Sequence, residues 1–125
     1  MLGYPALVMF SDPTSRIDYC RLMGLEQCDQ AWRDHYRPER QVTEKTPPTF
    51  IYQTTNDELV PPKGSIDLYM ALANAHVPVE MHLFGNGPHG SGLGMGDVAL
   101  DSWTTLLDHW LRSRGLYERA QPSEH

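Results

Sequence analysis

Two short apolar runs that each lead into a polar loop constrain the fold of this chain more than any other feature. The run at residues 50–55 is followed by Asp57, and a second run at residues 79–84 leads into a glycine-rich loop around His89. Runs of this kind are typical of strands in a parallel sheet, where the carboxyl ends of the strands meet at one edge. We therefore expect Asp57 and His89 on adjacent loops at the same end of a sheet.

The order of elements along the chain predicts an α/β fold. Apolar runs indicate three strands, at residues 4–10, 49–55 and 79–84. Helical patterns lie between and after them, at residues 17–24, 30–36, 61–76 and 97–114. Strands that alternate with helices form a parallel sheet with right-handed crossovers. We expect one three-layer α/β domain over residues 1–117, with a mostly parallel sheet of about three strands, and a loose tail at 118–125.

Spacing within the last two helical patterns predicts which side chains face the sheet. In the first of these helices the inner stripe is predicted to be Ile66, Tyr69, Met70 and Ala73. The last helix has a clearer apolar face, made of Trp103, Leu106, Leu107, Trp110 and Leu111, and it is expected to stop at Gly115. His76 stands at a helix end where glycine would adopt the left-handed conformation without cost.

Charge excludes several classes of partner. The formal net charge is −6, and the ten basic residues form no cluster. Arg33, Arg37 and Arg40 are interleaved with Asp34 and Glu39, which is typical of a solvated face. Binding to nucleic acid or to an anionic membrane surface needs clustered Lys and Arg. No apolar run approaches the ~20 residues of a membrane span, so we expect neither nucleic acid nor membrane as a partner.

The cysteines and histidines predict neither a metal site nor a cofactor site. Cys20 and Cys28 are the only cysteines, and although they could bridge, their spacing matches no zinc or redox motif. We expect them to be free thiols in a reducing compartment, with the cytoplasm as the default location. His35, His82, His109 and His125 are expected at the surface, and no cofactor or metal ion is implied.

Several short motifs occur together in a recognisable order. They are Leu2-Gly3-Tyr4-Pro5, Arg37-Pro38-Glu39-Arg40, Thr46-Pro47-Pro48-Thr49-Phe50, Asp57-Glu58-Leu59-Val60-Pro61 and Gly85-Asn86-Gly87-Pro88-His89-Gly90-Ser91-Gly92-Leu93. With the terminal helix, this set resembles the C-terminal half of an α/β-hydrolase. The nearest branch is the esterase and lipase group that includes acetyl-xylan-esterase-like members.

The resemblance implies a serine-type esterase in which Asp57 is the triad acid and His89 the triad base, acting on a small ester without a cofactor. Taken alone, Asp57 could be a turn or cap residue and His89 a loop residue. In the family the nucleophilic serine lies on a Gly-x-Ser-x-Gly elbow, and that motif is absent from this sequence. Ser11, at the end of the first strand, is the best-placed substitute nucleophile. Ser91 is too near His89 in sequence to point at its ring, and Ser65 reads as a helix cap.

Two further expectations follow from the missing elbow. The first is an alternative function: a catalytically inactive, truncated α/β-hydrolase remnant that folds and self-associates. The second concerns the strand at residues 4–10, which is interior in the family fold and here lacks its neighbour. An apolar, uncharged strand edge is a template for pairing with another chain. We therefore expect a homo-oligomer formed through the first strand.

Overall fold

The computed structural model describes residues 2–3, 19–22, 24 and 29–116. Their elements in chain order are β1 (Leu2–Gly3), α1 (Tyr19–Leu22), α2 (Gln30–His35), α3 (Pro38–Gln41), β2 (Thr49–Thr54), α4 (Lys63–Asn74), β3 (Val79–Phe84) and α5 (Ser102–Ser113). The predicted strand at residues 4–10 lies outside the described residues, as do Ser11, Cys28 and His125. So does the predicted tail at 118–125.

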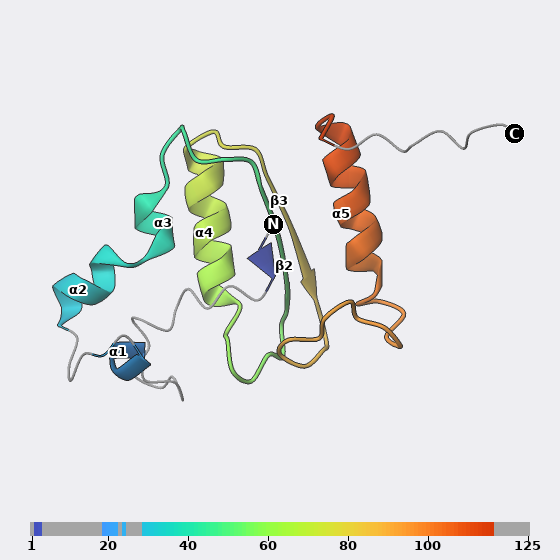
Figure 1. Ribbon diagram of the computed structural model, residues 1–125, viewed down its shortest axis with the longest axis horizontal. Helices are drawn as coiled ribbons and strands as arrows, with labels where there is room; N and C mark the ends of the chain where they lie inside the picture. The colour runs from blue at the N-terminus through green and yellow to red at the C-terminus, as the bar shows by residue number, and fades with distance from the viewer. Residues whose placement is uncertain (1, 4–18, 23, 25–28, 117–125) are drawn as a thin grey trace, which may run out of the picture.

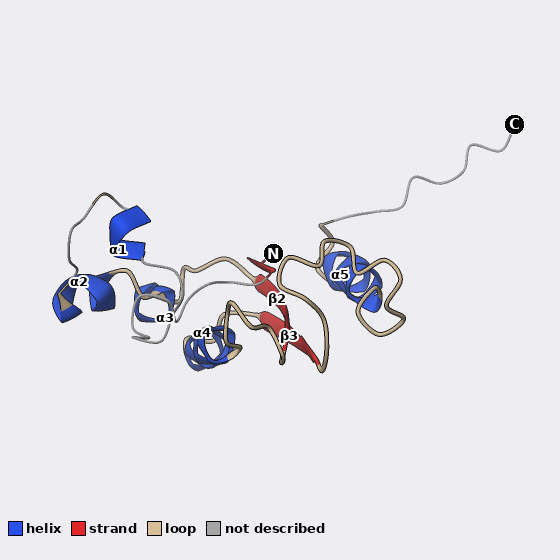
Figure 2. Ribbon diagram, turned by 90° about the horizontal axis from the view of Figure 1, so that it is seen from below, coloured by secondary structure: helices blue, strands red, loops and turns tan. Residues whose placement is uncertain are grey.

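A small parallel sheet forms the middle layer. Its strand order is β1-β2-β3, and both pairings are parallel. β2 pairs with β3 along its whole length, from Thr49 opposite Val79 to Thr54 opposite Phe84. Helix α4 lies on one face of the sheet and α5 on the other (Figures 1 and 2). The predicted three-layer α/β class is therefore confirmed.

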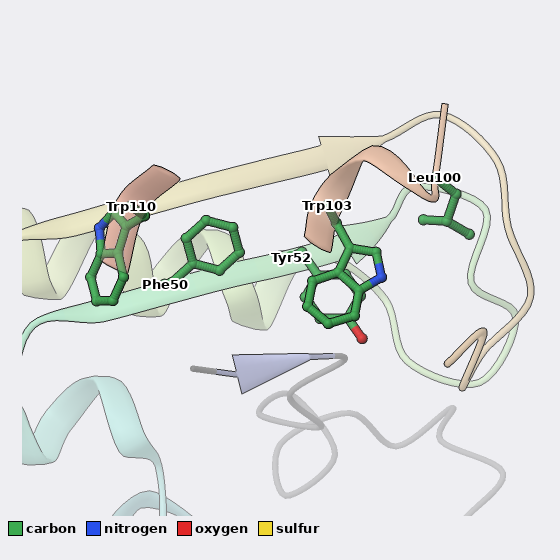
Figure 3. Close-up of a cluster of buried hydrophobic side chains, with 5 residues drawn as sticks. All are labelled: Phe50, Tyr52, Leu100, Trp103 and Trp110. Carbon is green, nitrogen blue, oxygen red and sulfur yellow. The ribbon is translucent and has the colours of Figure 1, made fainter. Parts of the chain in front are cut away.

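Alternation along β2 divides the core into two halves. Phe50 and Tyr52 face α5, where they pack with Leu100, Trp103 and Trp110 (Figure 3). Ile51 faces the other way. It packs with three residues of the α4 side: Leu68, Leu72 and Val77. Because both faces of β2 are covered, the strand reads as a nearly continuous apolar run.

Helix α5 has the predicted inner face but a later start. Trp103 and Trp110 are buried, and the leucines at 106, 107 and 111 pack against the same cluster. The prediction began this helix at Asp97, whereas the structure begins it at Ser102. The carboxylate of Asp97 accepts the backbone N–H groups of Ala99 and Leu100, both at 2.9 Å. A side-chain turn of this kind competes with helical hydrogen bonding, so the helix begins later along the chain.

The predicted inner stripe of α4 is wrong at Ile66, Met70 and Ala73, and only Tyr69 packs against the core as expected. Ile66 and Met70 are 41% and 50% exposed. The residues that the helix buries are Gly64, Ser65, Leu68 and Leu72. The buried hydroxyl of Ser65 donates to the side-chain oxygen of Gln53 in β2. Ser65 therefore belongs to the helix–sheet contact and is not a cap.

At the end of α4, His76 adopts the left-handed backbone conformation that its position in the sequence suggested. His76 follows the helix with φ 56°, and its N–H donates to the carbonyl of Ala73 at 3.0 Å. That conformation strains any residue other than glycine. The chain then turns into β3, which begins at the predicted residue and, among the described strands, pairs with β2 alone.

The region before β2 differs from prediction at two points. A short helix, α3, opens with Pro38 at its first turn and was not predicted. Cys20 is buried and disulfide-bonded, so the expectation of a free thiol is wrong. Whether a cysteine forms a bridge depends on the distance between Cβ atoms in the folded chain, which sequence spacing does not reveal. The interleaved charges do pair: Arg37 and Arg40 both contact Asp34.

Candidate active site

Asp57 follows β2 at the carboxyl end of the sheet, in a turn that its own side chain organises. Its Oδ1 accepts the backbone N–H groups of Leu59 at 2.9 Å and Val60 at 2.8 Å. The carboxylate is completely buried, with 0% of the side chain exposed. Two main-chain donors hold this buried side chain in one orientation, which leaves Oδ2 for another partner.

That partner is His89, on the loop after β3. The Nδ1 of His89 lies 2.8 Å from Oδ2 of Asp57. The imidazole is 34% exposed, so it lies between the buried carboxylate and the surface. The predicted contact between these two side chains at one end of the sheet is confirmed. A carboxylate in this position fixes the imidazole tautomer by accepting a hydrogen bond from the Nδ1–H group.

A buried polar contact also stabilises the turn that contains Asp57. Gln53, which is fully buried in β2, donates its side-chain amide to the carbonyl of Val60 at 2.6 Å. Because the N–H of Val60 binds Asp57, Gln53 holds the other side of the same peptide segment. The hydroxyl of Ser65 in α4 binds the oxygen of Gln53 in turn. The acid is therefore anchored through β2 to α4.

Two residues at this edge were missed in the sequence. Thr54 donates its hydroxyl to the carbonyl of Gly87 at 2.9 Å, and Asn56 accepts the N–H of Gly87 at 3.0 Å. The available signal was position, since both polar residues lie in the few positions before Asp57. No spacing rule connects them to Gly87, which is about thirty residues further along the chain.

A cavity of about 590 Å³ opens beside the imidazole. It is lined by Asn56, Glu58, Leu59, Gly87, Pro88 and His89. A second cavity, of about 530 Å³, lies near the opposite end of β2, where Thr46 and Thr49 contribute to its wall. Only the first cavity contains a residue of the Asp57–His89 pair. His89 therefore forms part of the wall of this cavity.

The described serines and histidines have distinct surroundings. Ser65 is buried in α4 and bound to Gln53, away from the solvent. His35 and His109 are exposed, as predicted. His82 is only part-exposed, and its Nε2 lies 2.7 Å from Glu80. Ser11 lies outside the described residues, so its distance from His89 stays a prediction.

The described part of the chain shows neither a metal-ligand cluster nor a membrane-spanning helix. It contains no group of three His, Cys, Asp or Glu side chains arranged to hold a metal ion. None of its helices has the length and apolar character needed to cross a membrane.

Comparison with known proteins decides the family. Residues 8–114 match the prolyl oligopeptidase family (Peptidase_S9). The chain belongs to this family. The match includes Asp57, His89 and every described helix and strand except β1, which precedes it. The resemblance to the C-terminal half of an α/β-hydrolase, seen in the sequence motifs, is thereby confirmed.

Solved structures give the same assignment for the fold. An acetyl ester-xyloside bifunctional hydrolase from Caldicellulosiruptor lactoaceticus is similar, with a TM-score of 0.81 and 31% identity over 94% of this chain and 42% of that chain. A carboxylesterase from Lactobacillus plantarum has a TM-score of 0.73 and 28% identity, over 95% of this chain and 45% of that chain. The prolyl oligopeptidase family member described here thus spans less than half of either structure.

A curated relative extends the comparison by sequence. The endo-1,4-beta-xylanase B of Butyrivibrio fibrisolvens is 33% identical over 91 residues, which are 72% of this chain and 14% of the relative. This family member therefore matches a small part of a much longer protein.

Proposed function

We propose that this chain carries the acid and base of an ester hydrolase of the α/β-hydrolase superfamily, with Asp57 as the acid and His89 as the base. The observation that carries the proposal is the 2.8 Å contact between a fully buried carboxylate and the Nδ1 of a part-exposed imidazole. Its position at the carboxyl end of two parallel strands, beside a cavity, is typical of active sites in such sheets. The named activities of the similar structures support the ester as substrate class.

The proposed chemistry follows from the two nitrogens of one ring. Asp57 accepts a hydrogen bond from the Nδ1–H group, so that Nε2 of His89 takes the proton of a serine hydroxyl as the serine oxygen attacks the ester carbonyl carbon. The same proton then goes to the leaving alkoxide as the carbon–oxygen bond breaks. Water repeats the sequence on the acyl-serine, releases the acid and restores the serine. No cofactor takes part in these steps.

Ser11 is the nucleophile that we propose to test first. The sequence contains no Gly-x-Ser-x-Gly elbow. The proposed mechanism therefore needs a serine outside such a motif to lie close to His89. Ser11 follows the predicted first strand, so we expect it on the same side of the sheet as Asp57 and His89.

A fluorophosphonate probe tests the proposal directly, because it labels only an activated serine. We expect a mass increase of one probe per chain, lost in His89→Ala, and a fall of about 10²–10⁴-fold in hydrolysis of a short-chain nitrophenyl ester in the same variant. His109→Ala is the matched control, since His109 lies exposed on α5. Labelling that persists in His89→Ala would contradict the proposed base. Peptide mapping then decides whether Ser11 is the labelled residue.

The alternative is a folded, self-associating domain without catalysis. It is favoured by the missing elbow motif and predicts no labelling at any probe concentration.

Both hypotheses share one further proposal, a homo-oligomer formed through the first strand. That predicted strand, at residues 4–10, lies outside the described residues; just before it, β1 pairs with β2 alone among the described strands. Light scattering at micromolar concentration tests it, and a monodisperse monomer would contradict it.

A further inference from the structure

We propose that Thr54 and Asn56 are positioning residues, which clamp the main chain of Gly87 and thereby hold His89 against Asp57. The inference rests on the proposed function of the Asp57–His89 pair and adds the residues that fix its geometry. It is carried by two hydrogen bonds to a single peptide residue, made from the strand end that also carries the acid.

This clamp, which consists of the side chains of Thr54 and Asn56, binds both main-chain polar groups of Gly87. The hydroxyl of Thr54 donates to the Gly87 carbonyl at 2.9 Å, and the side-chain oxygen of Asn56 accepts the Gly87 N–H at 3.0 Å. Asn56 also extends its amide to the side-chain oxygen of Asn86, at 3.4 Å. Residues 54–57 therefore bind residues 86–89 at several points, of which the Asp57–His89 contact is the last.

Close packing shows that this grip has no room for a side chain. Gly87 has φ 147°, and a Cβ atom placed on it would lie 2.7 Å from Cγ2 of Thr54. On its other side, the same atom would lie 2.8 Å from Cδ2 of Leu100, which is buried. The loop backbone is thus pressed between the end of β2 and Leu100. Only glycine permits that approach.

The clamp matters because the two members of the pair are held in different ways. Asp57 is fixed by the N–H groups of Leu59 and Val60, in its own turn. His89 lies instead on a loop whose neighbours Pro88 and Gly90 are exposed. Its distance from the carboxylate depends on where the loop backbone leaves the sheet. Gly87, two residues before His89, is where the clamp determines that path.

Thr54 and Asn56 contribute from different environments, which gives the experiment two independent variants. Thr54 is fully buried, and Thr54→Val removes the donor while keeping the shape of the side chain. Asn56 is exposed, so Asn56→Ala removes the acceptor with little risk to folding. Thr54→Ser and Asn56→Asp keep the donor and the acceptor respectively, and serve as rescue variants. Thr46→Val is the control, because its hydroxyl accepts the N–H of Thr43 near the other end of β2.

The readout is the Nδ1 proton of His89 in the NMR spectrum, and the rate at which that proton exchanges with water. It is assigned by its loss in His89→Gln. We expect Thr54→Val and Asn56→Ala each to raise the exchange rate by about tenfold, the factor that corresponds to one lost hydrogen bond. The rescue variants and Thr46→Val should stay near the wild-type rate. Near-UV circular dichroism of the Tyr52–Trp103 contact shows whether each variant is folded.

The outcomes separate the clamp from the proposed function. A wild-type spectrum without a slowly exchanging Nδ1 proton would contradict the pair itself, and with it the proposed function. A wild-type signal that neither Thr54→Val nor Asn56→Ala changes would overturn the clamp alone. So would equal acceleration in Thr46→Val, which would indicate general destabilisation. If Thr54→Val does not fold, Asn56→Ala and Asn56→Asp decide the question.

Discussion

The phenol ring of Tyr52 lies flat against the indole of Trp103, with ring centroids 4.2 Å apart and planes 4° from parallel. Tyr52 belongs to β2 and Trp103 to α5, so this contact joins the sheet to its last helix (Figure 3). The indole also donates its Nε1 proton to the carbonyl of Gly92 at 3.2 Å. One side chain therefore attaches both the helix and the loop after His89 to the strand that leads to Asp57.

Trp103→Ala should lower the free energy of unfolding by about 3–5 kcal/mol, the usual cost of removing a buried aromatic side chain. Leu116→Ala is the control, because Leu116 is 66% exposed and its loss should change stability by no more than about 0.5 kcal/mol. Urea unfolding followed by far-UV circular dichroism measures both. Similar midpoints for the two variants would contradict the packing described here.

Gly87→Ala should destabilise the chain more than Gly90→Ala. At Gly87 the new Cβ meets Thr54 and Leu100, whereas at Gly90, with φ 67°, it meets no atom within 4 Å. The backbone conformation alone costs about 1–2 kcal/mol at Gly90. Overpacking adds about 1–3 kcal/mol at Gly87. Thermal unfolding of the two variants side by side gives the difference, and an equal loss would argue against the close approach.

Ser65→Ala should cost about 1–3 kcal/mol, because it leaves the buried oxygen of Gln53 without its hydroxyl donor. Ser113→Ala provides the comparison. Its hydroxyl also donates, to the carbonyl of Trp110 at 2.8 Å, but the residue is exposed and water replaces the lost partner. Its effect should stay within about 0.5 kcal/mol. Denaturant titration of both proteins tests whether burial, rather than the hydrogen bond itself, sets the cost.

His76→Gly should raise stability by about 1 kcal/mol, since glycine adopts the left-handed conformation at φ 56° without steric strain. Asn74→Gly, two residues earlier and within α4, should instead lower stability by roughly 0.5 kcal/mol or less, because its effect is helix propensity alone. A shift of the melting temperature upwards for the first variant and downwards for the second is the expected pattern. Loss of stability in both would mean that the His76 side chain makes a stabilising contact.

Asp57→Asn and Asp57→Ala should separate the structural role of the acid from its charge. Asparagine keeps an oxygen for the N–H groups of Leu59 and Val60, whereas alanine leaves both without an acceptor. We expect Asp57→Ala to cost roughly 3 kcal/mol and Asp57→Asn about half of that. Equilibrium unfolding gives the two values. An equal loss in the two variants would place the stabilisation in the carboxylate charge and its contact with His89, because both substitutions remove them.

Strand β2 was predictable from the sequence because its environment is uniform. β2 is covered on both faces, so every residue from Phe50 to Thr54 is buried and the run carries no charge. Proline precedes it and polar turn residues follow it, which limits both ends. The contact between Asp57 and His89 was predictable from the order of the elements. Each occupies a loop that follows such a run, and parallel strands bring those loops together.

The face of α4 could not be predicted, because its sequence has two overlapping apolar stripes. Leu68 and Leu72 form one stripe, and Ile66 and Met70 form the other. Only the position of the helix over Ile51 and Gln53 selects between them, and that position is a property of the folded chain. Spacing within one element does not report its rotation about its own axis.

The clamp on Gly87 escaped prediction for a different physical reason. Thr54 and Asn56 act through main-chain groups of a residue 33 and 31 positions away. Main-chain hydrogen-bonding partners leave no signature in the side chains of the segment that is bound. Gly87 can be read directly from the sequence. Its close packing against Leu100 is known only once the folded structure gives the position of Leu100.

The complete burial of Asp57 gives the protein an internal measure of local opening. The chain has 16 acidic residues, and a water-soluble carbodiimide modifies a carboxylate only when the reagent reaches it. Glu58, the next residue, is exposed and reports the intrinsic labelling rate. Asp57, with no exposed side-chain surface, is labelled only when its turn unfolds transiently. The ratio of the two rates within one peptide therefore measures how often this end of the sheet opens.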